Sequence, residues 1–209
     1  MAVLILLGVD ALVGTVWAVT GEGLTMAVEE AVEGSASLLR NAVFLVLLLA
    51  ARNLAHLAVA GTFMAWLLVT RLNAESLTRV PHRWLKIFIF LGWIFPIVGW
   101  WIPKQIVDDI WASSRPGGVR GEHIGREPHS WLVWAWWVSW LLAFWVVPVS
   151  FVLLMSFADR SPEEIAIGAG LGLDVFTLVA SLVAAALLAV VVVRITRFQE
   201  GRIRVDSQG

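Results

Sequence analysis

Long apolar runs alternate with short polar stretches along this chain. The most extreme run extends from Trp131 to Phe157 and contains no charged side chain. About 20 apolar residues are enough for a helix to cross the hydrocarbon core of a bilayer, so this run can span it with some tilt. Its tryptophan-dense beginning is typical of the membrane–water interface. The pattern therefore predicts an integral membrane protein.

Four runs have the length and composition of transmembrane helices: residues 3–19, 42–69, 131–157 and 167–193. A fifth segment, residues 83–103, fits an unbroken membrane helix poorly, because Pro96 interrupts it and Pro103 ends it. Broken segments occur at membrane depth where neighbouring protein satisfies the freed backbone groups. We therefore expect an all-α membrane bundle of four transmembrane helices, with residues 83–103 as a re-entrant or interfacial segment.

The residues after Pro103 predict a short interfacial helix over 104–112. One face of this helix is apolar and includes Trp111, while Lys104 and Asp108 lie on the opposite face. Residues 113–130 are polar and rich in glycine and proline, which predicts a loop. We expect the whole chain, residues 1–209, to form a single polytopic domain.

The distribution of charge orients these predicted spans. Basic loops are retained in the cytoplasm. Four spans place most of the 15 lysine and arginine residues on one side, together with the tail 194–209. A fifth span would export that tail. We expect a protein of the cytoplasmic membrane with both termini inside. We also expect the first span to be retained rather than cleaved as a signal peptide, because Asp10 lies within it and no basic residue precedes it.

Composition narrows the classes of function. Hydrophobic residues make up 59% of the chain and charged residues 15%, against about 25% charged in a typical soluble protein. The absence of cysteine excludes disulfides, thiolate metal sites and cysteine nucleophiles. No catalytic or nucleotide-binding motif is present, and His82, His123 and His129 lack the spacing of a metal site. We expect no catalytic residue, no metal and no cofactor.

Ionisable residues inside the predicted spans form the first candidate site. Each costs about 2.5–3.5 kcal/mol on insertion scales unless a partner or a water-filled cavity compensates. Arg52 can pair with Asp174 or Asp10 at similar depth, with His56 one turn away beside the remaining carboxylate. A neutralised pair that stabilises the bundle is favoured, and a proton or ion pathway is the alternative. The cluster comprises Asp10, Arg52, His56 and Asp174.

Tryptophan supplies the second candidate site, because the chain has 13 Trp and no Tyr. Many of these residues fall near the predicted cytoplasmic boundary, as headgroup-level anchors do. The alternative is an aromatic groove for a lipid or a partner's helix, with basic side chains beside anionic headgroups. The candidate contact residues are Arg83, Trp84, Lys86, Trp93, Trp100, Trp101, Lys104 and Trp111. Separately, Gly168 and Gly172 have the spacing that permits close helix packing.

Two segments resemble a known family. FMAWLLVTRLNAESL (63–77) contains the pattern FxxW…RxNAxxL, and LGWIFPIVGWWIPKQIVDDIWASS (91–114) contains GWxxP…P…DIW. With the Trp-rich span and the ending VVRITRFQEGR (192–202), they resemble a bacterial family of small multi-span membrane proteins known only as a domain of unknown function. The resemblance covers roughly residues 55–202. It implies a membrane protein and no particular activity.

Two classes of function remain open. The first is a non-catalytic membrane protein: a scaffold, an assembly partner or a lipid-contacting subunit. The second is an oligomeric channel or small transporter that uses the cluster of Asp10, Arg52, His56 and Asp174. We expect membrane lipids as partners, with a membrane-protein partner or a homo-oligomer also open. We expect no nucleic acid, because the inside charges are interleaved with acids.

Overall fold

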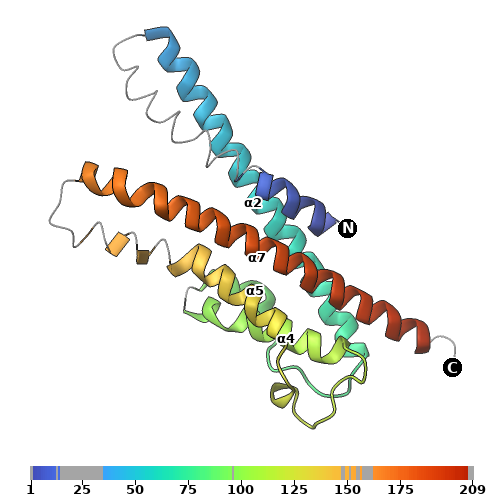
Figure 1. The fold of residues 1–209 in the computed structure, drawn as a ribbon. Coiled ribbons are helices and arrows are strands. Elements are labelled where there is room, and N and C mark those ends of the chain that lie inside the picture. The colour runs from blue at the N-terminus through green and yellow to red at the C-terminus, as the bar shows by residue number, and fades with distance from the viewer. Residues whose placement is uncertain are drawn as a thin grey trace. The chain divides into compact units, whose positions relative to one another are not determined.

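The computed structural model describes residues 2–12, 14, 35–95, 97–146, 149–150, 152–153, 156 and 162–206. All regular structure in these ranges is helical (Figure 1). The helices are α2 (Ser35–Ser76), α3 (Phe88–Ile94), α4 (Ile102–Ser114), α5 (Trp131–Leu141) and α7 (Pro162–Asp206), with the short turns η2 (Val98–Trp100), η3 (Ile124–Arg126) and the π-helical η4 (Leu142–Val146). The predicted all-α fold class is confirmed for this part of the chain.

Among the described residues, two helical stretches are long and apolar enough to cross a membrane. They are Asn53–Ser76 within α2 and Val175–Arg204 within α7, and a third is present if α3 and Val98–Ser114 count as one broken span. Ala2–Leu12 and Trp131–Val146 are shorter apolar helices. Residues 13 and 15–19 of the first predicted span, 3–19, lie outside the described residues, as do residues 147–148, 151, 154–155 and 157 of the third, 131–157. The prediction of four transmembrane helices therefore stays a prediction.

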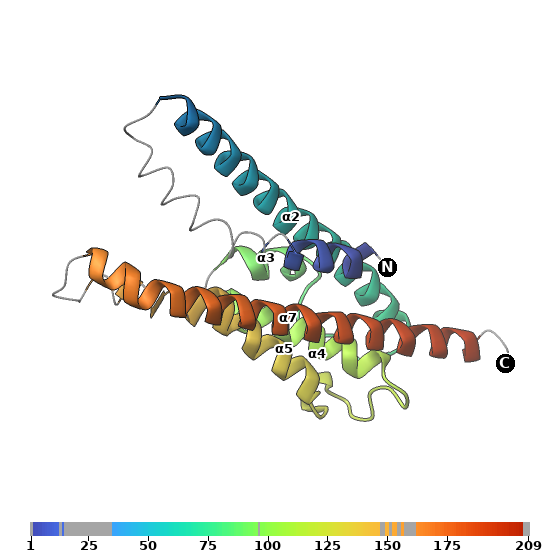
Figure 2. The same ribbon diagram turned by 45° about the horizontal axis from the view of Figure 1, so that its top comes forward.

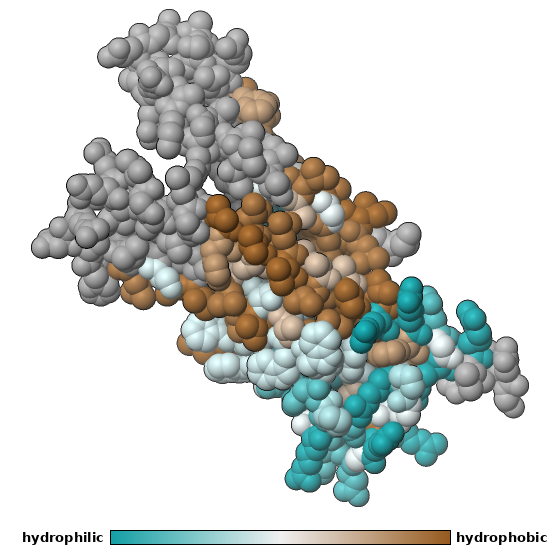
Figure 3. Space-filling model, in the orientation of Figure 1, coloured by the Kyte–Doolittle hydropathy of each residue, from teal (hydrophilic) through white to brown (hydrophobic). Residues whose placement is uncertain are grey.

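The chain falls into two compact units. The first comprises Met1–Gly61 and Leu142–Leu182, and the second comprises Thr62–Leu141 and Val183–Gly209. The predicted single domain stays a prediction. In the second unit, α4, α5 and the last part of α7 run side by side in both ribbon views (Figures 1 and 2). Hydrophilic side chains of this unit gather around the end of α7 and the loop after α4 (Figure 3).

Aromatic rings fill much of the core of the second unit. Phe63 stacks on Trp66 with ring centroids 5.6 Å apart, and it meets the edge of Trp93 at 5.9 Å. Trp137 stacks on Trp140 at 4.8 Å, and Trp93 meets Trp140 edge-on at 5.3 Å. Such pairs contribute about 0.5–1.5 kcal/mol beyond their buried area. The tryptophans predicted to contact lipid thus include one, Trp93, that packs in an aromatic core.

A sharp bend separates α3 from the helices that follow. The axes of Phe88–Ile94 and Val98–Ser114 differ by 109°. Gly92 permits the close packing at this bend, because a Cβ there would lie 3.3 Å from Cγ2 of Ile102 and 3.5 Å from Cγ of Pro103. The break falls between Ile94 and Val98, around the proline that the sequence identified as an interruption.

Helix α4 differs from the predicted interfacial helix. It is buried on all sides, with Ile106, Val107 and Ile110 fully enclosed. Lys104 and Asp108, expected on an exposed polar face, are only 5% and 6% exposed. The ammonium of Lys104 lies 2.6 Å from the Asp108 carboxylate and 3.8 Å from the ring centroid of Trp134 in α5. Pairing and a cation–π contact compensate the burial of this charge.

Candidate functional site

Four segments meet at the polar end of the second unit. They are the last two turns of α2, residues 77–86, the last turn of α4 and residues 196–204 of α7. Arg202 donates from one terminal nitrogen to the carbonyl of Ser113 at 2.5 Å and from the other to the carbonyl of Leu77 at 3.0 Å. Carbonyls at helix C-termini lack partners within their helix and attract cations. Arg202 therefore connects the ends of α2 and α4 to α7.

Gln199 makes the same connection inside the unit, where it is only 3% exposed. Its amide nitrogen donates to the carbonyl of Thr70 at 2.8 Å and to the hydroxyl of Ser114 at 2.9 Å. Its amide oxygen accepts from the Asn73 side chain at 3.2 Å. Buried polar groups of this kind stabilise a fold when their hydrogen bonds are made. Asn73 belongs to the RxNAxxL pattern, so this residue of the pattern has a structural role.

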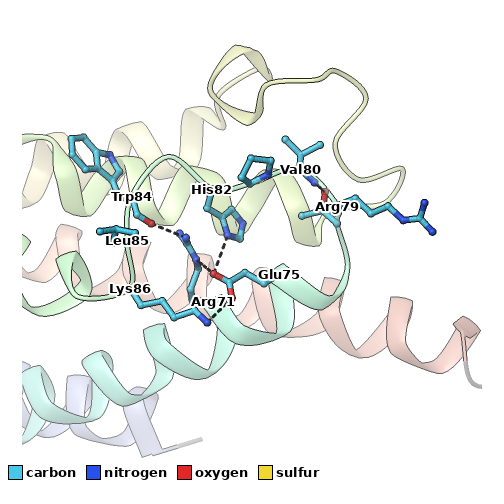
Figure 4. A pocket seen from close by; sticks show the side chains of 10 residues that line it. Arg71, Glu75, Arg79, Val80, His82, Trp84, Leu85 and Lys86 are labelled. Atoms are coloured by element: carbon cyan, nitrogen blue, oxygen red, sulfur yellow. Dashed lines mark hydrogen bonds and ion pairs between the residues drawn. The ribbon is translucent and has the colours of Figure 1, made fainter.

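Arg71 and Glu75 form the centre of the polar end, one helical turn apart on α2. The Arg71 guanidinium is almost completely buried and donates to Oε1 of Glu75 at 3.0 Å and to the carbonyl of Trp84 at 2.8 Å. The other carboxylate oxygen of Glu75 lies 2.8 Å from Nζ of Lys86. Figure 4 shows Glu75 between Arg71, His82 and Lys86. One carboxylate therefore orients two cations.

His82 is enclosed beside this group. Its imidazole is 0% exposed, with Nε2 2.9 Å from the Ser113 hydroxyl and Nδ1 3.8 Å from Oε1 of Glu75. Burial, together with the nearby Arg71 charge, lowers the pKa of His82 to about 4, although Asp109 and Glu75 act in the opposite direction. His82 is therefore neutral at pH 7.

An open pocket of about 580 Å³ lies between the last turn of α2 and residues 78–86 (Figure 4). Arg71, Glu75 and His82 line one part of it, and Arg79 and Lys86 also belong to its lining. Arg79 extends away from the other labelled charges in Figure 4. The pocket thus combines a fixed polar wall with two basic side chains that reach solvent.

Arg83 also belongs to the polar end, where it connects the residues before α3 to α4. Its backbone N–H donates to Oδ2 of Asp109 at 3.0 Å, and its Nε donates to Oδ1 at 2.8 Å. Asp109 is 1% exposed, so this is a buried carboxylate with a specific partner. The indole of Trp84 donates to Oε1 of Gln105 at 2.8 Å. Arg83 and Trp84, predicted as lipid or partner contacts, therefore use their polar groups within the unit.

The remaining contact candidates divide by exposure. The Lys86 side chain is 49% exposed, and Trp100 and Trp101 are 45% and 51% exposed. Trp111 is buried and meets Phe198 of α7 edge-on at 5.3 Å. Lys104 is the buried partner of Asp108 described above. Lys86, Trp100 and Trp101 are therefore candidates whose side chains are about half exposed in the described structure.

The predicted loop 113–130 is held by Glu127. This carboxylate forms an ion pair with Arg115 and accepts the backbone N–H groups of Arg120 at 2.7 Å and Gly121 at 3.0 Å. These two backbone donors hold the pKa of Glu127 below its usual range. Gly118 has a φ of 57°, in the region that favours glycine, and a Cβ there would lie 3.0 Å from an Arg202 nitrogen.

The cluster predicted inside the spans is described in part. In the first unit, Nδ1 of His56 lies 2.5 Å from Oδ1 of Asp10. The side chains of Arg52 and Asp174 lie outside the described part of the structure, so their predicted pairing stays a prediction. Gly168 and Gly172 lie in α7, and their surroundings are likewise outside it.

Sequence reasoning did not assemble the network of Arg71, Glu75, His82, Gln199 and Arg202. The i, i+4 spacing of Arg71 and Glu75 on a helix was the available local signal. Several other contacts join residues far apart in the sequence, such as His82 with Ser113, 31 positions away, and Gln199 with Thr70, 129 positions away. Local periodicity does not specify such pairs.

The fold and site define a helical protein with two or three helices suited to a membrane and a compact polar end. The chain belongs to the family described as a domain of unknown function (DUF4328), whose model matches residues 26–197. No curated protein and no solved structure matches it. The resemblance to an uncharacterised family is confirmed, while the bacterial distribution and the two motifs stay predictions.

Proposed function

We propose that this chain is a non-catalytic membrane protein that contacts lipid through the apolar segment, defined as residues 85–101. The exposure of this segment is the observation that supports the proposal most. Leu85 is 73% exposed, Ile94 67% and Ile97 71%, and other large apolar side chains lie among them. Contiguous exposed apolar surface of this kind marks a membrane or protein contact. Its tryptophans suit the interfacial region of a bilayer.

In this proposal, the apolar segment begins at the polar end and returns to it. Two contacts support a re-entrant path. Arg83, just before the segment, pairs with Asp109 of α4, which follows it. Arg202 then joins the carbonyls of Leu77 and Ser113, one before the segment and one after it. A segment that crossed the membrane completely would have to separate these partners.

The polar end is cytoplasmic in this proposal, and the chain crosses the membrane four times. Arg79, Lys86, Arg197 and Arg202 belong to this end, which fits the positive-inside rule. A lipid-contacting subunit or scaffold is then the functional class, with the apolar segment anchored in the cytoplasmic leaflet.

Fluorescence quenching tests the lipid contact. The chain has no cysteine, so Ile97→Cys and Glu122→Cys each carry a single thiol for an environment-sensitive label. In liposomes, brominated lipids should quench a label at position 97 strongly and a label at position 122, in the loop, only weakly. Equal quenching at both positions would contradict lipid contact by the apolar segment.

The contact between Asp10 and His56 favours a second candidate, an oligomeric proton or ion pathway. A carboxylate and an imidazole 2.5 Å apart inside predicted spans are the kind of pair that proton relays use. Reconstituted protein with a pH-sensitive dye inside the vesicles tests it. Proton flux that Asp10→Asn abolishes would support the pathway, and the absence of flux with the native chain would reject it.

A further inference from the structure

The pocket at the polar end carries an excess of positive charge. Arg71, Arg79 and Lys86 line it together with one acid, Glu75. Both oxygens of Glu75 are engaged, one by Arg71 and one by Lys86. His82 adds a neutral imidazole. With three cations and one carboxylate, the pocket lining has a formal charge of +2, which favours an anionic ligand.

The wall of the pocket is fixed before any ligand arrives. Arg71 is held by Glu75 and by the carbonyl of Trp84, and His82 is held by the hydroxyl of Ser113. The Lys86 side chain remains 49% exposed although Glu75 orients its ammonium. A preorganised wall reduces the entropy lost on binding, and the exposed ammonium is the group best placed to meet an anion.

The rim of the pocket is continuous with the apolar segment. Leu85 lines the pocket and is 73% exposed, and Ile87 and Phe90 follow it as exposed apolar residues. If the apolar segment lies in lipid, Lys86 and the pocket mouth lie at the depth of the phospholipid headgroups. Basic side chains at this depth attract acidic lipids by about 1 kcal/mol each, or roughly a factor of five in affinity.

We infer that this pocket binds a phosphate-bearing anion, namely the headgroup of an acidic phospholipid, with Lys86 and Arg79 as its charged contacts. The inference rests on the proposed function, because the depth of the pocket follows from lipid contact by residues 85–101. Free phosphate shares the same chemistry and is the alternative source of the ligand.

Binding to the full chain in an uncharged detergent tests this site. The probes are dihexanoyl phosphatidylglycerol, dihexanoyl phosphatidylcholine and inorganic phosphate, and the readout is the dissociation constant from calorimetry. We expect phosphatidylglycerol to bind tighter than either other probe. Lys86→Gln and Arg79→Gln should each weaken its binding about fivefold, and the double variant more. The exposed Arg126→Gln, outside the pocket, is the charge-matched control and should change binding less than twofold.

Each alternative outcome is decisive. Inorganic phosphate binding as tightly as phosphatidylglycerol would overturn the lipid headgroup as the ligand. Equal binding of phosphatidylglycerol and phosphatidylcholine, or unchanged binding in the double variant, would overturn the anion site. The same preparations labelled at position 97 distinguish the two proposals. Quenching by brominated lipids without selective headgroup binding rejects the pocket alone, whereas loss of quenching rejects the lipid contact on which it rests.

Discussion

At the scale of residues, the second unit is notable for buried charges that each have a partner. The buried Asp109 pairs with Arg83, the buried Lys104 pairs with Asp108, and the buried Arg71 guanidinium pairs with Glu75. Removing one member of a buried pair is strongly destabilising, because it leaves the other charge uncompensated. These pairs therefore specify which segments meet at the polar end.

Arg83→Ala should lower the free energy of unfolding by about 3–5 kcal/mol, because it leaves the Asp109 carboxylate buried without its guanidinium. Arg126→Ala removes an exposed arginine and should change it by less than about 0.5 kcal/mol. Denaturant unfolding in detergent, followed by tryptophan fluorescence, measures both. Equal stability of the two variants would show that the Arg83–Asp109 pair contributes little.

His82 should make stability depend on pH. Its pKa is about 4 in the folded chain and 6.5 when unfolded, so between these values the unfolded chain binds more protons. The contribution of neutral His82 to the free energy of unfolding is fully present above pH 6.5. It is lost as the pH drops toward 4, by about 3 kcal/mol at most. Comparing unfolding at pH 7 and pH 5 checks this.

His82→Gln should reduce that pH dependence, because glutamine has no proton to gain. The exposed His123→Gln variant serves as control and should retain the dependence of the native chain. A native-like pH dependence in His82→Gln would assign the titration to another group.

The surroundings of some candidate residues could be predicted from the sequence and those of others could not, for a physical reason. Lys86 was a candidate for lipid contact because its charge lies beside an apolar segment; it lines the pocket, and its contact with lipid stays a prediction. The burial of Lys104 and Asp108 could not be foreseen, because Trp134 of α5 covers Lys104 and His129, just before α5, pairs with Asp108. A lysine ammonium needs either an ion-pair partner or solvent. The sequence does not specify which of the two it meets, because that depends on the fold.

At the scale of elements, apolar length predicted α2 and α7, and proline predicted the break before η2. The sequence could not specify the angle of that break or the complete burial of α4. The angle depends on Gly92, which lets α3 approach Ile102 and Pro103, and the burial of α4 depends on neighbours such as Trp134 and Phe198. The amphipathic pattern of residues 104–112 identified the helix correctly, but its polar face is covered rather than exposed.

Gly92→Leu should destabilise the second unit by about 1–3 kcal/mol, because its side chain must displace Ile102 and Pro103. Gly201→Ala, in α7, meets no atom within 4 Å and should be neutral or stabilising by up to about 1 kcal/mol. Thermal unfolding of both variants measures the difference. A Gly92→Leu variant as stable as Gly201→Ala would mean that α3 and α4 are not tightly packed.

At the scale of the whole molecule, the proposed arrangement is a membrane protein with an apolar segment that returns to the side from which it came. Hydropathy predicted a membrane location, and the long helices Asn53–Ser76 and Val175–Arg204 agree with it. The charge pattern predicted the cytoplasmic side of residues 77–84 and 104–130. The contacts of Arg202 and Arg83 supply the physical reason for placing these segments together.

Single-cysteine accessibility tests whether residues 85–101 return to the side of the membrane from which they came. Arg79→Cys and Glu122→Cys lie before and after the apolar segment, and Glu200→Cys lies near the end of α7. A membrane-impermeant maleimide should leave all three unlabelled in intact cells and label all three in inverted vesicles. Labelling of position 122 in intact cells while position 79 stays protected would mean that residues 85–101 cross the membrane, which would contradict the account.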